Sequence, residues 1–204
     1  MGARTMIEEL SLGNTTAVLR LLAMLIVATM VHELGHAGMA RLLRIPIRRI
    51  AIGLGPVIWR RQLRADQELL LRAFPVGAMI GLPGRLSPSG ESSRPLYHDV
   101  CVAASGPLIN LLLFVGLAVV DGAGVVSPAV LPWLRTLALL SAFLGISNLL
   151  PIPGLDGGHL LMLGASKLGL RLSPREQVVI QQIGLRLVVV LCCGVLFARL
   201  MRVL

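Results

Sequence analysis

The sequence predicts a mainly α-helical membrane protein of about four transmembrane helices, with a three-helix core and a small membrane-associated β segment. Of the 204 residues, 55% are hydrophobic and only 14% are charged, whereas a soluble domain carries about 25% charged residues. The hydrophobic residues also gather in runs long enough to cross a bilayer, which takes about 20 residues. The length favours one domain over residues 1–204, and the composition excludes most soluble folds.

Four apolar runs are candidates for the transmembrane helices. They cover approximately residues 21–40, 100–120, 130–150 and 178–200. The fourth run is interrupted by Gln181, Gln182 and Arg186, so the first three are expected to form the core. The first run resembles a signal peptide in length, but Glu8 and Glu9 stand where a signal would carry positive charge. We therefore expect the first run to be retained.

The positive charge is concentrated in one linker. The chain has a net charge of +9, and ten arginines lie within residues 41–94, between the first and second runs. Because an excess of Lys and Arg marks the cytoplasmic side, we expect residues 41–98 to be cytoplasmic and the 121–132 loop to be outside. The charge then reflects topology, and no nucleic-acid partner is expected. The arginine-rich composition further suggests a bacterial inner (plasma) membrane, with the active site towards the cytoplasm.

Residues 45–82 predict the β segment. Ile50, Ile52 and Leu54 alternate with smaller residues, and a period of two is typical of a strand. A second strand is expected over residues 68–74, extended by residues 75–80. The prolines of this region suit sheet edges and turns. We expect a small sheet lying against the membrane on its cytoplasmic side.

The strongest chemical signal is His32-Glu33-Leu34-Gly35-His36 in the first apolar run. On a helix, positions i and i+4 share one face, so both imidazoles can bind one metal ion, and the glutamate between them can act as a base in hydrolysis. Ionisable side chains inside a membrane span are energetically unfavourable and usually functional. The motif therefore predicts a metal site for hydrolysis on the first transmembrane helix.

A catalytic zinc site needs a third protein ligand. Besides the motif, the chain has His98 and His159, and it has Asp156 in a Pro- and Gly-rich stretch directly after the third run. Such a stretch breaks a helix, which membranes tolerate only beside protein or water. The predicted topology returns Asp156 to the depth of the motif, so Asp156 is the preferred ligand, with helix capping as its alternative role. His159 is expected to be supporting or structural, and His98 is unassigned.

Three motifs in chain order resemble those of the site-2 protease family of intramembrane zinc metalloproteases. They are His32-Glu33-x-x-His36, Gly106-x-x-x-Asn110 and Asn148-x-x-Pro151-x-x-x-Leu155-Asp156-Gly157. Together they join the three best runs into one core over most of residues 20–165. Three ordered motifs are far more specific than a single one.

The resemblance implies that His32, His36 and Asp156 bind one zinc ion (Zn2+) per chain and that Glu33 is the catalytic base. It also places two amides near the site, where they would hold substrate backbone or the developing oxyanion. These amides are Asn148 and Asn110, and the alternative for both is a buried amide that joins helices. The 45–82 segment resembles the family's β segment that holds substrate extended, and an edge strand near residues 69–80 can pair with the substrate.

The function expected from the resemblance is a zinc-dependent endopeptidase that cleaves transmembrane or membrane-proximal segments in regulated intramembrane proteolysis. Its partners would be a single-span membrane protein substrate and the lipid bilayer. A catalytically silent zinc-binding scaffold is one alternative, although the intact Glu33 argues against it. A small transporter is another, because broken helices with polar residues are also a transporter signature, but the chain has no internal repeat. Neither a PDZ domain nor a nucleotide-sensing domain is expected.

Overall fold

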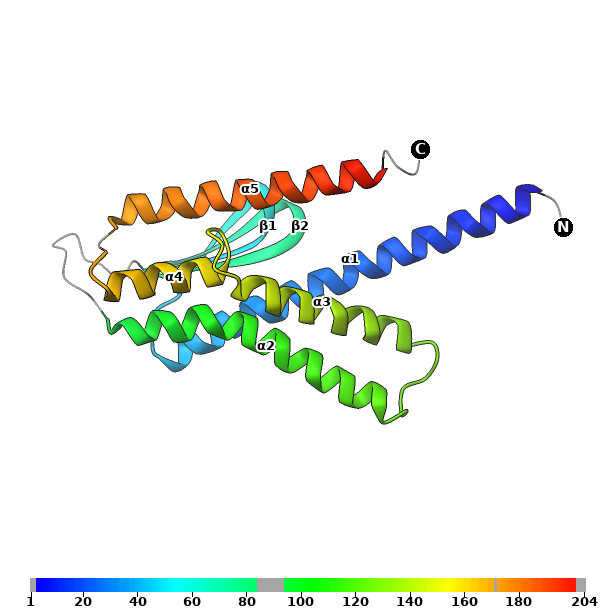
Figure 1. Ribbon diagram of the computed structural model, residues 1–204, viewed down its shortest axis with the longest axis horizontal. Helices are drawn as coiled ribbons and strands as arrows, with labels where there is room; N and C mark the ends of the chain where they lie inside the picture. Colours follow the sequence, from blue (N-terminus) through cyan, green and yellow to red (C-terminus); the bar gives the residue numbers. More distant parts are fainter. Residues whose placement is uncertain (1–2, 84–93, 171, 201–204) are drawn as a thin grey trace.

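The computed structural model describes residues 3–83, 94–170 and 172–200, and most of them are helical. The described elements are, in chain order, α1 (Ala3–Leu42), β1 (Arg49–Arg64), β2 (Gln67–Gly81), α2 (Leu96–Gly122), α3 (Leu131–Leu149), α4 (Asp156–Lys167) and α5 (Pro174–Leu200). Helices α1, α2 and α3 pack against one another, β2 packs on α1, and α4 packs on α2 and α3 (Figure 1). Helix α5 runs beside α4.

All four predicted apolar runs correspond to helices, namely α1, α2, α3 and α5, and the third run exceeds α3 by one residue at each end. Two described segments, Thr15–Leu42 and Leu96–Gly122, are long and apolar enough to cross a membrane by length and composition. Large apolar side chains remain exposed on α2 and α3, including Leu112 (66%) and Phe143 (68%). Such surfaces suit contact with lipid, because lipid tails, unlike water, do not drive apolar side chains inwards. A total of four transmembrane helices stays a prediction.

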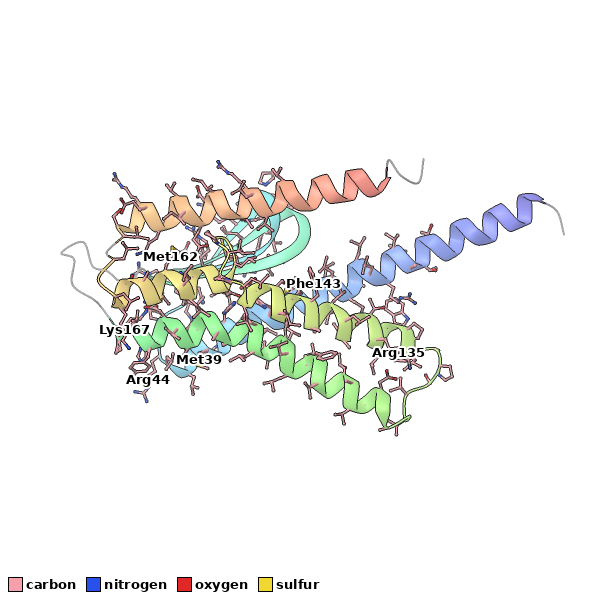
Figure 2. All side chains as sticks on the ribbon, viewed as in Figure 1. Met39, Arg44, Arg135, Phe143, Met162 and Lys167 are labelled. Carbon is pink, nitrogen blue, oxygen red and sulfur yellow. The ribbon has the colours of Figure 1, made fainter. Side chains whose placement is uncertain are left out.

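Three basic residues mark the two ends of the bundle. Arg44 and Lys167 lie at one end, and Arg135 lies near the turn between α2 and α3 at the other (Figure 2). Arg135 is paired there with Asp121, with 2.9 Å between Nε and Oδ2. This arrangement is the one expected if residues 41–98 and Lys167 face the same side of a membrane. Which side that is stays a prediction.

The β segment is a small sheet in which β1 and β2 pair antiparallel, with several changes of register. Four segments pair in sequence across the sheet. Their order is residues 59–62, 68–71, 49–52 and 78–81. Leu71 therefore lies between Ile52 and Trp59, inside the sheet. The expectation of an edge over all of residues 69–80 is therefore wrong for residues 69–71, whereas residues 78–81 do form one edge of the sheet.

The predicted break after the third run is confirmed. Helix α3 ends at Leu149 and α4 begins at Asp156, and the turn between them contains Gly154 with a φ of 97°. Residues with a side chain rarely adopt this left-handed conformation, so glycine suits the position. The short helix α4 was not predicted, because two consecutive glycines in its first turn disfavour a helix by local propensity.

Candidate metal centre

His32 and His36 lie one turn apart on α1 and project from the same face. Their Nε2 atoms are 3.2 Å apart, and their rings meet edge to face with centroids 4.8 Å apart. Helix α2 crosses α1 directly at this point. A Cβ atom added at Gly106 would overlap His36 Nε2 and would come within 2.8 Å of His32 Nε2. Glycine at this position therefore lets α2 approach both imidazoles.

One face of α2 also orients the two rings. Val102, Gly106 and Asn110 follow one another at intervals of four residues, so they lie along one stripe of the helix. The carbonyl oxygen of Val102 lies 2.6 Å from His36 Nδ1 and accepts its hydrogen. This bond places the proton on Nδ1 and leaves Nε2 free to bind a metal, which is the usual support for a histidine ligand.

Asn110 supports His32 in the way that the Val102 carbonyl supports His36. Its side chain is fully buried, Nδ2 lies 3.3 Å from His32 Nδ1, and Oδ1 has no hydrogen bond among the described residues. The oxygen and nitrogen of an amide are nearly the same size, and their placement follows from the hydrogen-bond network. Exchanging the oxygen and nitrogen of the amide brings Oδ1 to His32 Nδ1–H. This gives the buried oxygen a partner and leaves Nε2 of His32 free to bind a metal.

Asp156 completes a group of three ligand atoms. Its Oδ2 lies 3.0 Å from His32 Nε2 and 3.4 Å from His36 Nε2. Without a metal ion, burial opposes the charge on Asp156, but hydrogen bonds from protonated Nε2 atoms of His32 and His36 outweigh it and lower the pKa to about 2. A metal ion bound by the three side chains would replace those protons. Asp156 is therefore a carboxylate at neutral pH.

The fit of a metal ion can be judged from these distances. Two imidazole nitrogens and one carboxylate oxygen are common zinc ligands, at about 2.0–2.2 Å from the metal. In a tetrahedral site, such bonds separate neighbouring ligand atoms by about 3.3 Å. The three separations are 3.0, 3.2 and 3.4 Å. The three side chains thus form a group that could hold a metal ion, with one tetrahedral position left open.

The glycines after Asp156 allow its close approach to α3. A Cβ atom at Gly157 would overlap the carbonyl oxygen of Leu150, and one at Gly158 would overlap the carbonyl oxygen of Ile152. Both positions are buried. The first turn of α4 therefore packs directly on the backbone that ends α3, which explains why two helix-weakening residues stand beside the ligand.

Glu33 connects the site to the sheet. Its carboxylate is half-buried and lies beside the backbone N–H of Ile80. Ile80 belongs to residues 78–81, which form the sheet edge. The edge strand therefore lies next to the glutamate between the two histidines.

The structure brings His32, Glu33, His36, Asn110 and Asp156 together. The remaining predicted residues are His98, Asn148 and His159. Asn148 Nδ2 donates to Leu144 O of its own helix at 2.9 Å. His98 contacts the ring of Tyr97. Burial lowers the pKa of His159, and this residue is not part of the ligand group found among the described residues.

Sequence reasoning missed two contributors to the site, the carbonyl of Val102 and the N–H of Ile80. Both are backbone groups, which every residue carries, so no residue type could have marked them. Gly106 was noted as part of a motif, and its position against both imidazoles explains that motif physically.

Comparison with known proteins matches the chain to the model of peptidase family M50 over residues 20–127 and 115–191. A Nostoc sp. protein named as a zinc metalloprotease, all3971, is 36% identical over 104 residues, which are 47% of this chain and 28% of that protein. The membrane metalloprotease ARASP, chloroplastic, of Arabidopsis thaliana is 31% identical over 115 residues, 52% of this chain and 25% of that protein.

A solved structure, the site-2 protease from Methanocaldococcus jannaschii, shares the fold. The TM-score is 0.59 at 23% identity, covering 97% of this chain and 77% of that one. The chain spans only about a quarter of the curated relatives that it matches, 28% of the Nostoc protein and 25% of the Arabidopsis protein.

Proposed function

The chain belongs to peptidase family M50, and from this premise we propose that it is a zinc-dependent endopeptidase that cuts peptide bonds within or beside a membrane. The predicted resemblance to the site-2 protease family is confirmed by the family match and the shared fold. One observation carries the proposal. Two imidazole nitrogens and a carboxylate oxygen lie 3.0–3.4 Å from one another, beside a glutamate on the same helix as the histidines.

In this proposal His32, His36 and Asp156 hold one zinc ion per chain. When bound, zinc acts as a Lewis acid that polarises the scissile carbonyl and activates water. Glu33 takes a proton from the attacking water and delivers it to the leaving amine. The backbone N–H of Ile80 lies beside the Glu33 carboxylate, where it can hold the carboxylate in place for both transfers.

The two amides take different roles. Asn110 is fully buried and contacts His32, so we assign it to orienting that ligand instead of touching the substrate. Asn148 is half-buried at the end of α3 and remains the candidate for stabilising the oxyanion. Its Nδ2 carries two N–H groups, of which one donates to Leu144 O and the other can donate to an oxyanion.

The sheet edge supports a proposal for substrate binding. A helical substrate hides its peptide bonds in its own hydrogen bonds, so it must unwind before cleavage. Pairing with an exposed strand edge would replace the lost bonds. Residues 78–81 offer such an edge, and Ile80 contacts Glu33. An extended segment of a single-span membrane protein added there would lie beside the catalytic base, as regulated intramembrane proteolysis requires.

The position of the site along α1 supports access from one membrane surface. His36 lies six residues before the end of α1 at Leu42, which is about 9 Å along a helix. The same end of the bundle carries Arg44 and Lys167 (Figure 2). We propose a multi-pass protein of a bacterial inner membrane, with the site reached by water from the cytoplasm.

Zinc content of the detergent-purified protein tests the proposal without knowledge of the substrate. We expect about one zinc per wild-type chain and a loss of zinc in Asp156→Ala. Asp121→Ala is the matched control, because Asp121 pairs with Arg135 away from the site and should keep its zinc. Zinc bound equally by wild type and Asp156→Ala would disprove the ligand assignment.

Glu33→Gln separates a protease from a silent scaffold or a transporter. This variant should keep its zinc and lose about 100-fold or more of its cleavage rate, since general base catalysis contributes about 10²–10⁴-fold. Cleavage can be followed on a panel of single-span membrane proteins reconstituted with the enzyme. Cleavage by Glu33→Gln at the wild-type rate would refute the role of Glu33.

A further inference from the structure

Helix α5 contacts the loop that carries Asp156. The side-chain oxygen of Gln181 accepts a hydrogen bond from the backbone N–H of Gly154, two residues before Asp156. A partly buried backbone N–H needs a partner, and here the partner comes from a helix distant in sequence. One of the three polar residues that interrupt this apolar run thus has a specific bonding role.

The same contact brings two backbones together. A Cβ atom at Gly184 would overlap the carbonyl oxygen of Pro153, and one at Gly154 would lie 2.5 Å from Leu185 N. Gly184 is buried, and Gly154 has a positive φ. Neither position has space for a side chain, so the backbone of α5 rests directly on the loop.

This contact is narrow. Among the helices and strands that the structure describes, α5 packs only on α4. An apolar cleft of about 370 Å³ opens beside the contact, lined by residues that include Pro153, Ile180 and Leu187. The loop between α3 and α4 rises to meet α5 (Figure 1). Gln181 and Gly184 therefore both contribute to the attachment between α5 and the loop that carries Asp156.

We propose that α5 is a positioning element of the metal site, and that Gln181 is the positioning residue that holds the loop so that Asp156 meets His32 and His36. The inference rests on the proposed function, in which Asp156 is a zinc ligand. Ligand distances must stay within about 0.2 Å of their ideal values. A loop that is tethered on both sides, by α3 and by α5, restricts the carboxylate more tightly than a loop held by α3 alone.

Zinc affinity, measured by competition with a chromogenic chelator on the full-length protein in detergent, tests the inference. Gln181→Met keeps the length of the side chain and removes the acceptor oxygen, and Gly184→Ala separates α5 from Pro153. We expect each to weaken zinc binding by about 10-fold or more, within the 10–100-fold typical of groups that support a ligand. Gln181→Glu retains an acceptor oxygen and should bind zinc within about threefold of wild type.

Two substitutions in the same helix are matched controls. Gln182 is exposed, and a Cβ atom at Gly194 would meet nothing within 4 Å. Gln182→Met and Gly194→Ala should therefore keep the wild-type zinc affinity. Thermal unfolding of the metal-free protein should show that both variants fold, with a somewhat lower midpoint for Gln181→Met because the N–H of Gly154 loses its partner.

The outcomes distinguish this inference from the proposed function. If wild type binds one zinc and Asp156→Ala loses it, while Gln181→Met and Gly184→Ala bind zinc as tightly as wild type, only the role of α5 is refuted. A purely structural role is indicated if Gln181→Met lowers the unfolding midpoint with zinc affinity unchanged, and this also refutes the inference. If wild type binds no zinc, both proposals fail. Should Gly184→Ala not fold, the Gln181 pair carries the test alone.

Discussion

A methyl group at Gly106 tests the crossing of α1 and α2 on which the metal site depends. In Gly106→Ala, the new Cβ would overlap His36 Nε2 and would lie 2.6 Å from His36 Cε1 and 2.8 Å from His32 Nε2. Ordinary contacts begin at about 3.4 Å, so even the more distant ring must withdraw by about 0.6 Å. Metal sites tolerate deviations of only about 0.2 Å.

The expected result is a loss of zinc affinity of about 100-fold, the upper end of the effect of groups that support a ligand. Overpacking should also destabilise the fold by about 1–3 kcal/mol. Both effects follow from the same displacement, because neither imidazole can retreat without leaving its partner, Val102 O for His36 or Asn110 for His32.

The assay is chelator competition on purified protein, with thermal unfolding measured on the metal-free form. Gly116→Ala is the matched control in the same helix, since a Cβ atom there would meet nothing within 4 Å. It should keep its zinc and gain slightly in stability, because alanine is favoured over glycine in a helix by about 1 kcal/mol. Wild-type zinc affinity in Gly106→Ala would refute the derived packing of the two helices.

Three further results are expected. Asn110→Leu should weaken zinc binding by about 10–100-fold, as measured by chelator competition, whereas Asn148→Leu should bind zinc as wild type does. If Asn110→Leu binds zinc as tightly as wild type, Asn110 does not support His32. Gly35→Ala places a Cβ 2.7 Å from Ser105 O and should destabilise the fold by about 1–3 kcal/mol in thermal unfolding, and a midpoint unchanged from wild type would contradict the packing. Breaking the buried ion pair of Arg94 with Asp99 by Asp99→Ala should destabilise the fold by about 3–5 kcal/mol, and an effect under 1 kcal/mol would show that the pair is hydrated.

Local pattern predicted the chemistry of α1 well. The spacing of His32 and His36 places both on one face of any helix. The apolar run around them predicted that this segment is a helix. The prolines and glycines after the third run also predicted the break between α3 and α4. These features depend on residues near one another in the chain, where geometry follows from the helical repeat.

His32 contacts Asp156 although the two residues are 124 positions apart in the sequence. Spacing alone left Asp156 as one candidate beside His98 and His159, the predicted topology favoured Asp156, and the motif resemblance agreed. Tertiary packing decides such a contact, because the depth and rotation of each helix depend on how closely its neighbours approach. Here that approach depends on Gly106 and Gly157, whose missing side chains leave the space.

The sequence by itself therefore determined the class of the protein, the helix that carries the histidines and glutamate, and the residue types available to bind a metal. Only the tertiary structure decided which strand segment forms the sheet edge, which backbone groups orient His36 and Glu33, and how α5 contacts the loop of Asp156. The physical reason is that a side chain reveals its chemistry in the sequence, whereas backbone N–H and C=O groups are alike in nearly every residue. Their roles depend on position, and position is a property of the whole fold.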